Sequence, residues 1–377
     1  MQYITSGESH SEKLVVIVRD VPFGISVCED DFAQELNRRS STFGRSSRQI
    51  TESNDFNIVS GVRNGKTTGG SVCVEITNNV LEIAQDKFIP RPGHADLNGA
   101  LKLNVDDVTL ISEVSSARQT AARVVAGVIA KNFLVNFRCE VYSFVSSIGS
   151  IKIDTPKFYN LENLPYVGSI EFNELRCPDE KVSKDMKDLI VKAKSNDDTL
   201  GGSFYVVATG VDVGLGGYES YEKRLDSHLS YYLMSIPSVK GVEIGSIYHQ
   251  AQNIGSVCID NIEKSSDGKL TRSTNYNGGI EGGMTTGDVI FIKCFVKPVP
   301  TTPKPFKSIN LETNETFSEN YSMRHDTCVV PACGVIAESE VAIVLANAYM
   351  DKFGHDTMSE IIEACNNYRR KLKIRFS

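Results

Sequence analysis

Three of the six histidines lie in sequence settings that suit proton transfer. His10 follows a Gly-Glu-Ser sequence, His94 lies in the Arg-Pro-Gly-His-Ala-Asp sequence of residues 91–96, and His325 is flanked by an arginine and an aspartate. An imidazole near a guanidinium and a carboxylate can act as a general acid, because its pKa lies close to neutral pH. Each could instead be an ordinary surface or hydrogen-bonding histidine, so both interpretations stay open. No two histidines have the helical spacing of a zinc site, and we predict no metal site.

Arginines are concentrated near the same motifs. They occur at Arg38, Arg39, Arg45, Arg48, Arg91, Arg118 and Arg324. A guanidinium binds carboxylates and phosphates through paired hydrogen bonds. The chain is acidic overall, with 40 lysines and arginines against 47 aspartates and glutamates, so these arginines predict a local site for a small, multiply anionic ligand and not a nucleic-acid partner. Alternatively, the arginines of residues 38–48 are solvated charges in what we predict to be a polar loop.

Two glycine-rich segments resemble nucleotide-binding motifs without matching them. Residues 61–67 are one residue short of a P-loop and lead into a strand, whereas a P-loop opens a helix. Residues 278–283 lack the strand-turn-helix context of a dinucleotide-binding fingerprint. A nucleotide hydrolase is therefore a remote alternative. The second segment still offers close backbone approach to a ligand, because glycine has no Cβ.

The composition is that of a soluble globular protein, with 41% of the 377 residues apolar and 23% charged. No apolar stretch approaches 18 residues, which predicts no transmembrane helix and no membrane partner. The N-terminal residues lack the basic and apolar regions of a secretion signal. The nine cysteines are scattered and form no C-x-x-C pair, so we expect free thiols and a cytoplasmic location.

The elements that must position these residues mix hairpins with helices. Asn64-Gly65 can take the positive φ angles of a type I′ turn and predicts a hairpin between two β-rich runs. Ser116 and Gln119 have the spacing of a capping box, and the apolar positions that follow predict a helix buried on more than one side. The expected strands are residues 14–18, 56–62, 71–76, 204–211 and 289–296, and the expected helices are residues 30–37, 117–134, 178–198, 225–236 and 338–353, the last ended by Gly354 in the left-handed conformation. This order favours one α+β domain over residues 1–377 and not a doubly wound sheet.

Taken together and in this order, the motifs resemble the chorismate synthase family over nearly the whole chain. Each motif alone is weak, whereas the complete ordered set is specific. The matching segments are residues 7–10, 38–39, 44–45, 60–62, 65–67, 91–96, 115–123, 233–236, 240–245, 278–283, 297–298 and 324–326, together with Cys328.

The resemblance implies a β-α-β sandwich in which helices pack between antiparallel sheets. It implies a lyase that converts 5-enolpyruvylshikimate-3-phosphate to chorismate and phosphate, the last step of the shikimate pathway toward the aromatic amino acids. This 1,4-anti elimination has no net redox change but needs reduced FMN. The resemblance further implies a homotetramer. An external flavin reductant is expected because no reductase domain is visible, although use of NAD(P)H by the chain itself stays open.

The resemblance also assigns roles to individual residues. His94 would serve the departing phosphate as an acid, His10 would act near the N1–O2 edge of the flavin, and Asp326 would assist proton removal through flavin N5. The residues implied to bind substrate are Arg39, Arg45, Arg118 and Arg324. The residues implied to bind FMN are Ser9, Ser115, Ser116, Asn275, Asn277, Gly287, Lys297, Thr301 and Arg324. The cofactor supplies the electronic chemistry, and the protein supplies orientation and electrostatics.

The chain departs from the family pattern at several positions. Ser11 replaces a glycine, Asn277 replaces an alanine, and Val114 replaces an arginine expected at the flavin edge. A charge-assisted hydrogen bond contributes about 1.5–3 kcal/mol, so its loss weakens binding by one to two orders of magnitude. These departures motivate one alternative: a diverged paralogue that binds flavin or an anionic metabolite without catalysing the elimination.

Overall fold

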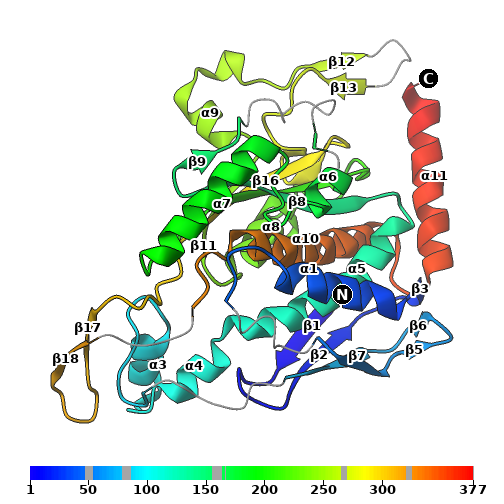
Figure 1. Cartoon of the computed structure of the whole chain (residues 1–377). Helices are drawn as coiled ribbons and strands as arrows, with labels where there is room; N and C mark the ends of the chain where they lie inside the picture. Colours follow the sequence, from blue (N-terminus) through cyan, green and yellow to red (C-terminus); the bar gives the residue numbers. More distant parts are fainter. Residues whose placement is uncertain are drawn as a thin grey trace.

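Two antiparallel sheets enclose a pair of long helices in the computed structural model, which describes residues 1–46, 54–78, 86–154, 164–165, 167–264, 270–319 and 325–376 (Figure 1). Helix α5 (Thr120–Val135) packs on strands of the first sheet, and α10 (Val330–Phe353) packs on strands of the second. The two helices also pack against each other. This arrangement confirms the predicted α+β sandwich with helices between antiparallel sheets.

The first sheet has the strand order β1-β2-β7-β4 and the second the order β11-β16-β10-β8-β9. Alternate side chains of the central strand β2, from Leu14 to Val18, are buried, as expected for a sheet with one face on the core. The strands of the first sheet are β1 (Gln2–Ser6), β2 (Lys13–Arg19), β7 (Val72–Thr77) and β4 (Phe56–Ser60). Those of the second are β11 (Val239–Ile244), β16 (Ile290–Val296), β10 (Gly202–Thr209), β8 (Glu140–Ile148) and β9 (Ile151–Lys152).

Smaller elements surround this sandwich. The short strands are β3 (Phe23–Ser26), β5 (Val62–Arg63), β6 (Lys66–Thr68), β12 (Ile262–Lys264), β13 (Leu270–Arg272), β14 (Ile280–Glu281), β15 (Met284–Thr285), β17 (Phe306–Ile309) and β18 (Thr316–Glu319). The remaining α-helices are α1 (Glu29–Ser40), α3 (Asp96–Leu103), α4 (Thr109–Val114), α6 (Val167–Glu171), α7 (Glu180–Ser195), α8 (Leu225–Met234), α9 (Ile247–Gln252) and α11 (Met358–Phe376). The 3₁₀ turns are η1 (Ala117–Gln119), η4 (Tyr221–Lys223) and η5 (Gly255–Val257).

Helices α5 and α10 cross at small side chains. A Cβ atom added to Gly127 would lie 2.2 Å from the Cβ of Ser339, so only glycine permits this approach. Helix α10 is long and apolar enough to span a membrane, contrary to the sequence-based expectation, but 94% of its 18-residue apolar window is buried inside the protein. The apolar composition of α10 is therefore accounted for by its central place in the core.

A buried ionic cluster joins α10 to its neighbours. The carboxylate of Glu338, which is fully buried, accepts hydrogen bonds at 2.8 Å from Arg38 of α1, Lys131 of α5 and Arg176, and at 2.7 Å from the hydroxyl of Ser143 in β8. Burial opposes ionisation, but the three cations hold the pKa of Glu338 well below its usual range. The ionised carboxylate therefore ties four elements together inside the sandwich.

Several predicted elements are confirmed, and some details were wrong. The hairpin between β5 and β6 has φ angles of 51° at Asn64 and 68° at Gly65, as a type I′ turn requires. Helix α1 extends to Ser40, so Arg38 and Arg39 are helical and not in a loop. Helix α10 begins eight residues earlier than expected.

The predicted helix ends also differ from the structure. Gly354 has φ 120° and ψ 168°, which is not the left-handed helical conformation. Half of the predicted capping box is present: Ser116 Oγ accepts a hydrogen bond, but from the amide of Arg118. The side-chain amide of Gln119 instead donates from Nε2 to the backbone carbonyls of Gly7 and Val114, so it links η1 to the end of β1.

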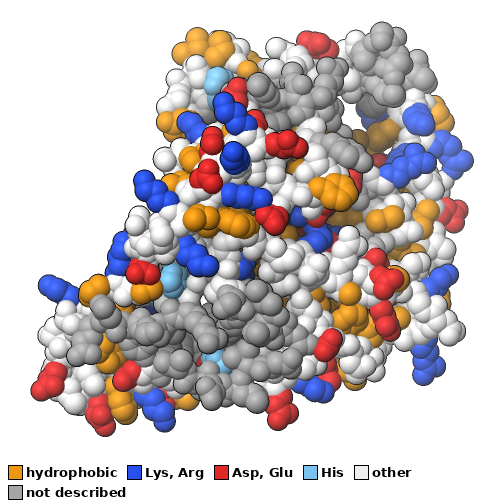
Figure 2. All heavy atoms as spheres, in the orientation of Figure 1, with side chains coloured by type: hydrophobic (Ala, Val, Ile, Leu, Met, Phe, Trp, Pro, Cys, Tyr) orange, Lys and Arg blue, Asp and Glu red, His pale blue; other side chains and the backbone are white. Residues whose placement is uncertain are grey.

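Helix α11 packs against α10 through a polar contact. Arg369 donates two hydrogen bonds of 2.7 Å to Asp212, and the hydroxyl of Tyr349 in α10 donates to the same carboxylate at 2.9 Å. Figure 2 shows lysine and arginine side chains gathered over α11. Asp212 therefore links Arg369 of α11 to Tyr349 of α10.

We predict that Glu338→Gln lowers the free energy of unfolding by about 3–5 kcal/mol, because it leaves three cations around a neutral amide. The measurement is urea denaturation at pH 7 followed by circular dichroism. Because the folded pKa of Glu338 is depressed, its contribution is present above the ordinary carboxyl pKa and is lost as the pH falls.

The matched control is Glu75→Gln, which removes an ion pair with the exposed Lys13 and should cost less than about 1 kcal/mol. Equal losses for Glu338→Gln and Glu75→Gln would contradict the structural role of the buried cluster.

Candidate active site

The turn after β1 places His10 against α4. Glu113, near the end of α4, approaches the Nδ1 atom of His10 with Oε1 at 2.6 Å and accepts the backbone N–H of His10 with Oε2 at 2.8 Å. The backbone carbonyl of Glu113 accepts the N–H of Ser9 at 3.1 Å. The side chains of His10 and Glu113 are only 16% and 9% exposed. Sequence reasoning missed Glu113, because 103 residues separate it from His10 and no motif spacing connects them.

The predicted flavin residues Ser9 and Ser116 lie beside this pair. Ser116 Oγ donates to Ser9 Oγ at 3.0 Å. Asn78, also missed by sequence reasoning, donates from Nδ2 to the carbonyls of Ser9 and Ser11 at 2.7 and 2.9 Å. The side chain of Asn78 is oriented by Arg118, whose Nε donates to Oδ1 at 3.3 Å. The structure therefore brings together Ser9, His10, Ser116 and Arg118. Ser115, which directly precedes Ser116 in the chain, is exposed.

Arg39 meets the same turn from α1. Its side chain is 2% exposed, and it donates to Thr120 Oγ1 at 2.9 Å and to the carbonyl of Ala117 at 3.3 Å. Two predicted substrate arginines, Arg39 and Arg118, thus converge on the start of α5, and oxygens of neutral groups are among their hydrogen-bond acceptors. A guanidinium can bind a carboxylate or phosphate through paired hydrogen bonds, so these two arginines bring anion-binding side chains to the region.

Arg45 and Asp326 form a second group close by. Arg45 Nε lies 3.4 Å from Asp326 Oδ2, and the backbone N–H of Ser46 donates to Oδ1 at 2.7 Å. Gly44 has φ 95°, and a Cβ there would lie 3.0 Å from the Cβ of Cys328, so this pairing of segments requires glycine.

Two buried thiols adjoin these groups. Burial raises the pKa of Cys333 to about 12, against the opposing charges of Arg45 and Arg39. Burial likewise raises the pKa of Cys328 to about 12, with Arg45 and Asp326 among the charges that act on it. Arg39 and Arg45 therefore both act electrostatically on the same thiol of α10.

His94 lies in a third group, at the start of α3. Its Nδ1 is 3.1 Å from the carbonyl of Pro92, and its Nε2 is 3.1 Å from Thr301 Oγ1. Lys297 Nζ donates to the carbonyl of Gly93 at 2.8 Å. The structure thus brings together three residues that the sequence analysis singled out: His94, Lys297 and Thr301.

The electrostatics around His94 favour its neutral form. Burial is the largest cause that lowers its pKa, and the positive charges of Arg91 and Lys297 lower it further. Arg91 itself is fixed by two hydrogen bonds to the fully buried Asp96, at 2.7 and 3.0 Å. At neutral pH the imidazole is therefore uncharged and can accept a proton when an anion arrives.

The remaining predicted flavin residues lie elsewhere. Asn275 uses its side chain within the glycine-rich segment, donating to the carbonyl of Val289 at 2.8 Å and accepting from Gly279 N–H at 2.7 Å. Figure 1 shows this segment near β12 and β13, at the opposite end of the molecule from α3 and α4. The structure therefore does not bring Asn275, Asn277 and Gly287 to His10 or His94. Arg324, predicted to bind both substrate and flavin, lies outside the described residues.

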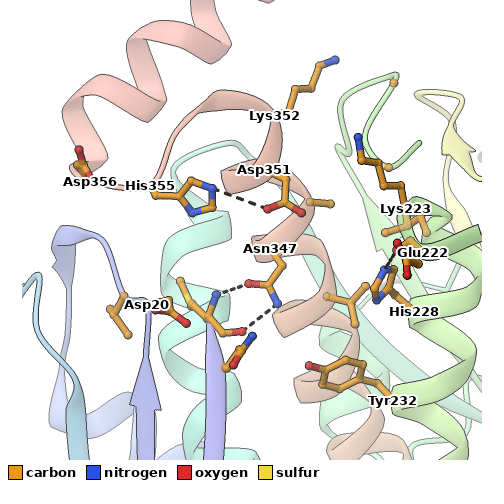
Figure 3. Close-up of a pocket in the computed structure, with 18 of the residues that line it drawn as sticks. Asp20, Glu222, Lys223, His228, Tyr232, Asn347, Asp351, Lys352, His355 and Asp356 are labelled. Carbon is orange, nitrogen blue, oxygen red and sulfur yellow. Dashed lines mark hydrogen bonds and ion pairs between the residues drawn. The ribbon is translucent and has the colours of Figure 1, made fainter. Parts of the chain in front are cut away.

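A cavity of about 1170 Å³ lies on a different part of the molecule (Figure 3). It is lined by β1, the residues around η4 and the end of α10. Five of the residues that line it carry carboxylates: Asp20, Glu219, Glu222, Asp351 and Asp356. None of the predicted catalytic or binding residues lines it. An acidic cavity suits an anionic substrate poorly, so we place the candidate site at the start of α5. No cluster of three metal-binding side chains occurs among the residues that the structure describes.

The fold and the arginines at the start of α5 are those of an α+β enzyme for an anionic substrate. Comparison with known proteins points to one family. The family model for chorismate synthase matches residues 1–350. Chorismate synthases of Bacillus licheniformis and Bacillus subtilis are each 39% identical over 388 residues, covering 98% of this chain and 99% of theirs. A crystal structure of a chorismate synthase superposes with a TM-score of 0.82 at 33% identity, covering 99% of this chain and 98% of that one. The chain belongs to the chorismate synthase family.

We predict that the pKa of His94 in the ligand-free protein lies below 6.5, the ordinary value for histidine. NMR titration of the ring protons would measure it. Lys297→Met should raise this pKa toward 6.5, because it removes a nearby positive charge. The control Lys304→Met, which removes a lysine paired with Asp198, should leave it unchanged. A wild-type pKa above 6.5 would contradict the described environment of His94.

Proposed function

We propose that this chain catalyses the 1,4-anti elimination of phosphate from 5-enolpyruvylshikimate-3-phosphate, which yields chorismate for aromatic amino acid biosynthesis. The observation that carries the proposal is its 39% identity to chorismate synthases over 98% of the chain. The chemistry of the described groups supports it. The structure contains three strongly polar groups, which are built around Ser9 and His10, around Arg45 and Asp326, and around His94. These groups offer cations and proton carriers for a substrate that has one phosphate and two carboxylates.

Members of this family use a reduced flavin, and we propose FMN as the form used here. The donor set fits that group: the hydroxyls of Ser9 and Ser116 and the imidazole of His10 suit the polar edge of a flavin ring, and the ammonium of Lys297 suits a phosphate. When bound, the reduced flavin supplies electron density transiently while the C–O bond breaks. The protein contributes binding, orientation and proton positions.

The arginines and His94 perform separate parts of the proposed reaction. Arg39, Arg45, Arg118 and Arg324 bind the anionic groups of the substrate and neutralise charge that moves onto the leaving phosphate. His94 is neutral in the free protein, and the arrival of a phosphate dianion favours its protonated form, which then gives its proton to the departing phosphate. Asp326, held by Ser46 N–H and Arg45, assists removal of the substrate proton.

The setting of the reaction is also proposed by analogy with the family. We place the enzyme in the cytoplasm as a homotetramer, with an external source of reducing equivalents, ultimately NAD(P)H, that keeps the flavin reduced. We propose no nucleic-acid or membrane partner and no metal.

The experiment that tests the function is an anaerobic assay with dithionite-reduced FMN and 5-enolpyruvylshikimate-3-phosphate, followed by chorismate absorbance. Chorismate should form with reduced FMN and not with oxidised FMN. Absence of product from protein that binds FMN in calorimetry would overturn the proposal in favour of a flavin-binding paralogue.

We expect His94→Ala to lower kcat about 10²–10⁴-fold, as for loss of a general acid, with little change in melting temperature. His355→Ala is the matched control, because His355 is 57% exposed and lies outside the three groups. An unchanged kcat in His94→Ala would refute its role as proton donor.

We expect Val114→Arg to tighten FMN binding about 10–100-fold, because a charge-assisted hydrogen bond contributes roughly 1.5–3 kcal/mol. Val114 is 57% exposed at the end of α4, directly before Ser115. Leu110→Arg, one turn earlier on α4 at a position 55% exposed, controls for added positive charge. Calorimetry that finds equal affinities for the two variants would contradict a specific flavin contact at position 114.

A further inference from the structure

Glu113 makes three contacts with two consecutive residues of the turn after β1. Its two carboxylate oxygens reach the Nδ1 atom and the backbone N–H of His10, and its carbonyl accepts the N–H of Ser9. Glu113 as a whole residue is only 7% exposed, so water competes little for these hydrogen bonds. Because a carboxylate has two acceptor oxygens, Glu113 serves the ring and the backbone of His10 at the same time.

The turn is also held from its other side. Asn78 is 3% exposed and binds the carbonyls of Ser9 and Ser11, so the backbone of residues 9–11 is fixed independently of Glu113. What Glu113 alone determines is the imidazole. Within the described part of the chain no hydrogen bond is made by Nε2 of His10, whereas Nδ1 faces the carboxylate.

We propose that Glu113 is the positioning residue of His10: by accepting the Nδ1 proton it fixes the ring orientation and the tautomer and leaves Nε2 to meet the ligand. An ionised carboxylate can only accept, so the proton of a neutral His10 ring must be on Nδ1. Nε2 then offers a lone pair, and it becomes a donor only when the ring gains a second proton. That the ligand at Nε2 is a flavin rests on the proposed function, but the tautomer does not.

Replacement of the carboxylate by an amide gives a sharp contrast. In Glu113→Gln the amide oxygen can still accept the backbone N–H of His10, while the amide NH₂ faces Nδ1. A neutral ring would then accept at Nδ1 and carry its proton on Nε2. The shape of the turn is retained, and only the chemical identity of the ring atom that faces the ligand is reversed.

The test is ¹⁵N NMR of the histidine rings at a pH where His10 is neutral, in the ligand-free full chain. Wild type should show His10 protonated on Nδ1, and Glu113→Gln should show it protonated on Nε2. Glu75→Gln, which changes a carboxylate paired with Lys13, should retain the wild-type pattern. An Nε2–H tautomer in wild type, or an unchanged tautomer in Glu113→Gln, overturns the proposal.

Kinetics provide the second measurement. In the anaerobic assay, Glu113→Gln should lower kcat at least tenfold with a less than threefold change in the KM for substrate and an unchanged melting temperature. Glu113→Asp, which keeps the acceptor, should retain the Nδ1–H tautomer and recover part of kcat. Wild-type activity in Glu113→Gln would refute the positioning role.

The two measurements separate the inference from the proposed function. If wild type forms no chorismate while the tautomers behave as expected, the proposed reaction fails and the role of Glu113 stands. If Glu113→Gln does not fold, the wild-type and Glu113→Asp spectra still decide whether Nδ1 carries the proton.

Discussion

The close crossing of α5 and α10 determines where the two halves of the protein lie. Each helix carries one sheet on its outer side, so the distance between the helices sets the distance between the sheets. Gly127 permits that distance, because any larger residue would overlap Ser339. The candidate site lies at the start of α5, so the end of a buried helix holds Arg118 and Thr120 beside the turn that carries His10.

The charges inside the sandwich contribute to specificity as well as to stability. Rotation of α10 about its axis would separate Glu338 from Arg38, Lys131 and Arg176. It would also separate Glu340 from Arg123 and Tyr3. Burial raises the pKa of Glu340, because a carboxylate charge is costly away from water. A rotation that removed the partners of Glu340 would therefore be unfavourable. These two carboxylates, two residues apart, fix the rotation of α10 relative to α1, α5 and β1.

The sequence predicted most of the frame and only part of the site. Strand β2, the Asn64-Gly65 turn and the body of α5 follow from local rules, and the structure confirms them. The start of α10 was missed, because a helix buried on all sides shows no amphipathic period. The partnership of His10 with Glu113 could not be predicted either, since it depends on α4 folding back onto the turn after β1. Proximity of distant segments is a property of packing, which local patterns do not record.

The two buried thiols near the arginines have a consequence for a protein that works with a reduced flavin. Reduced flavins react with dioxygen and release peroxide, and the thiolate is the form of cysteine that peroxide oxidises. Because burial raises the pKa of Cys328 and of Cys333 to about 12, both side chains are thiols and not thiolates at neutral pH. These two sulfur atoms, which lie within the electrostatic influence of Arg45, are therefore poor targets for peroxide because their burial keeps them protonated.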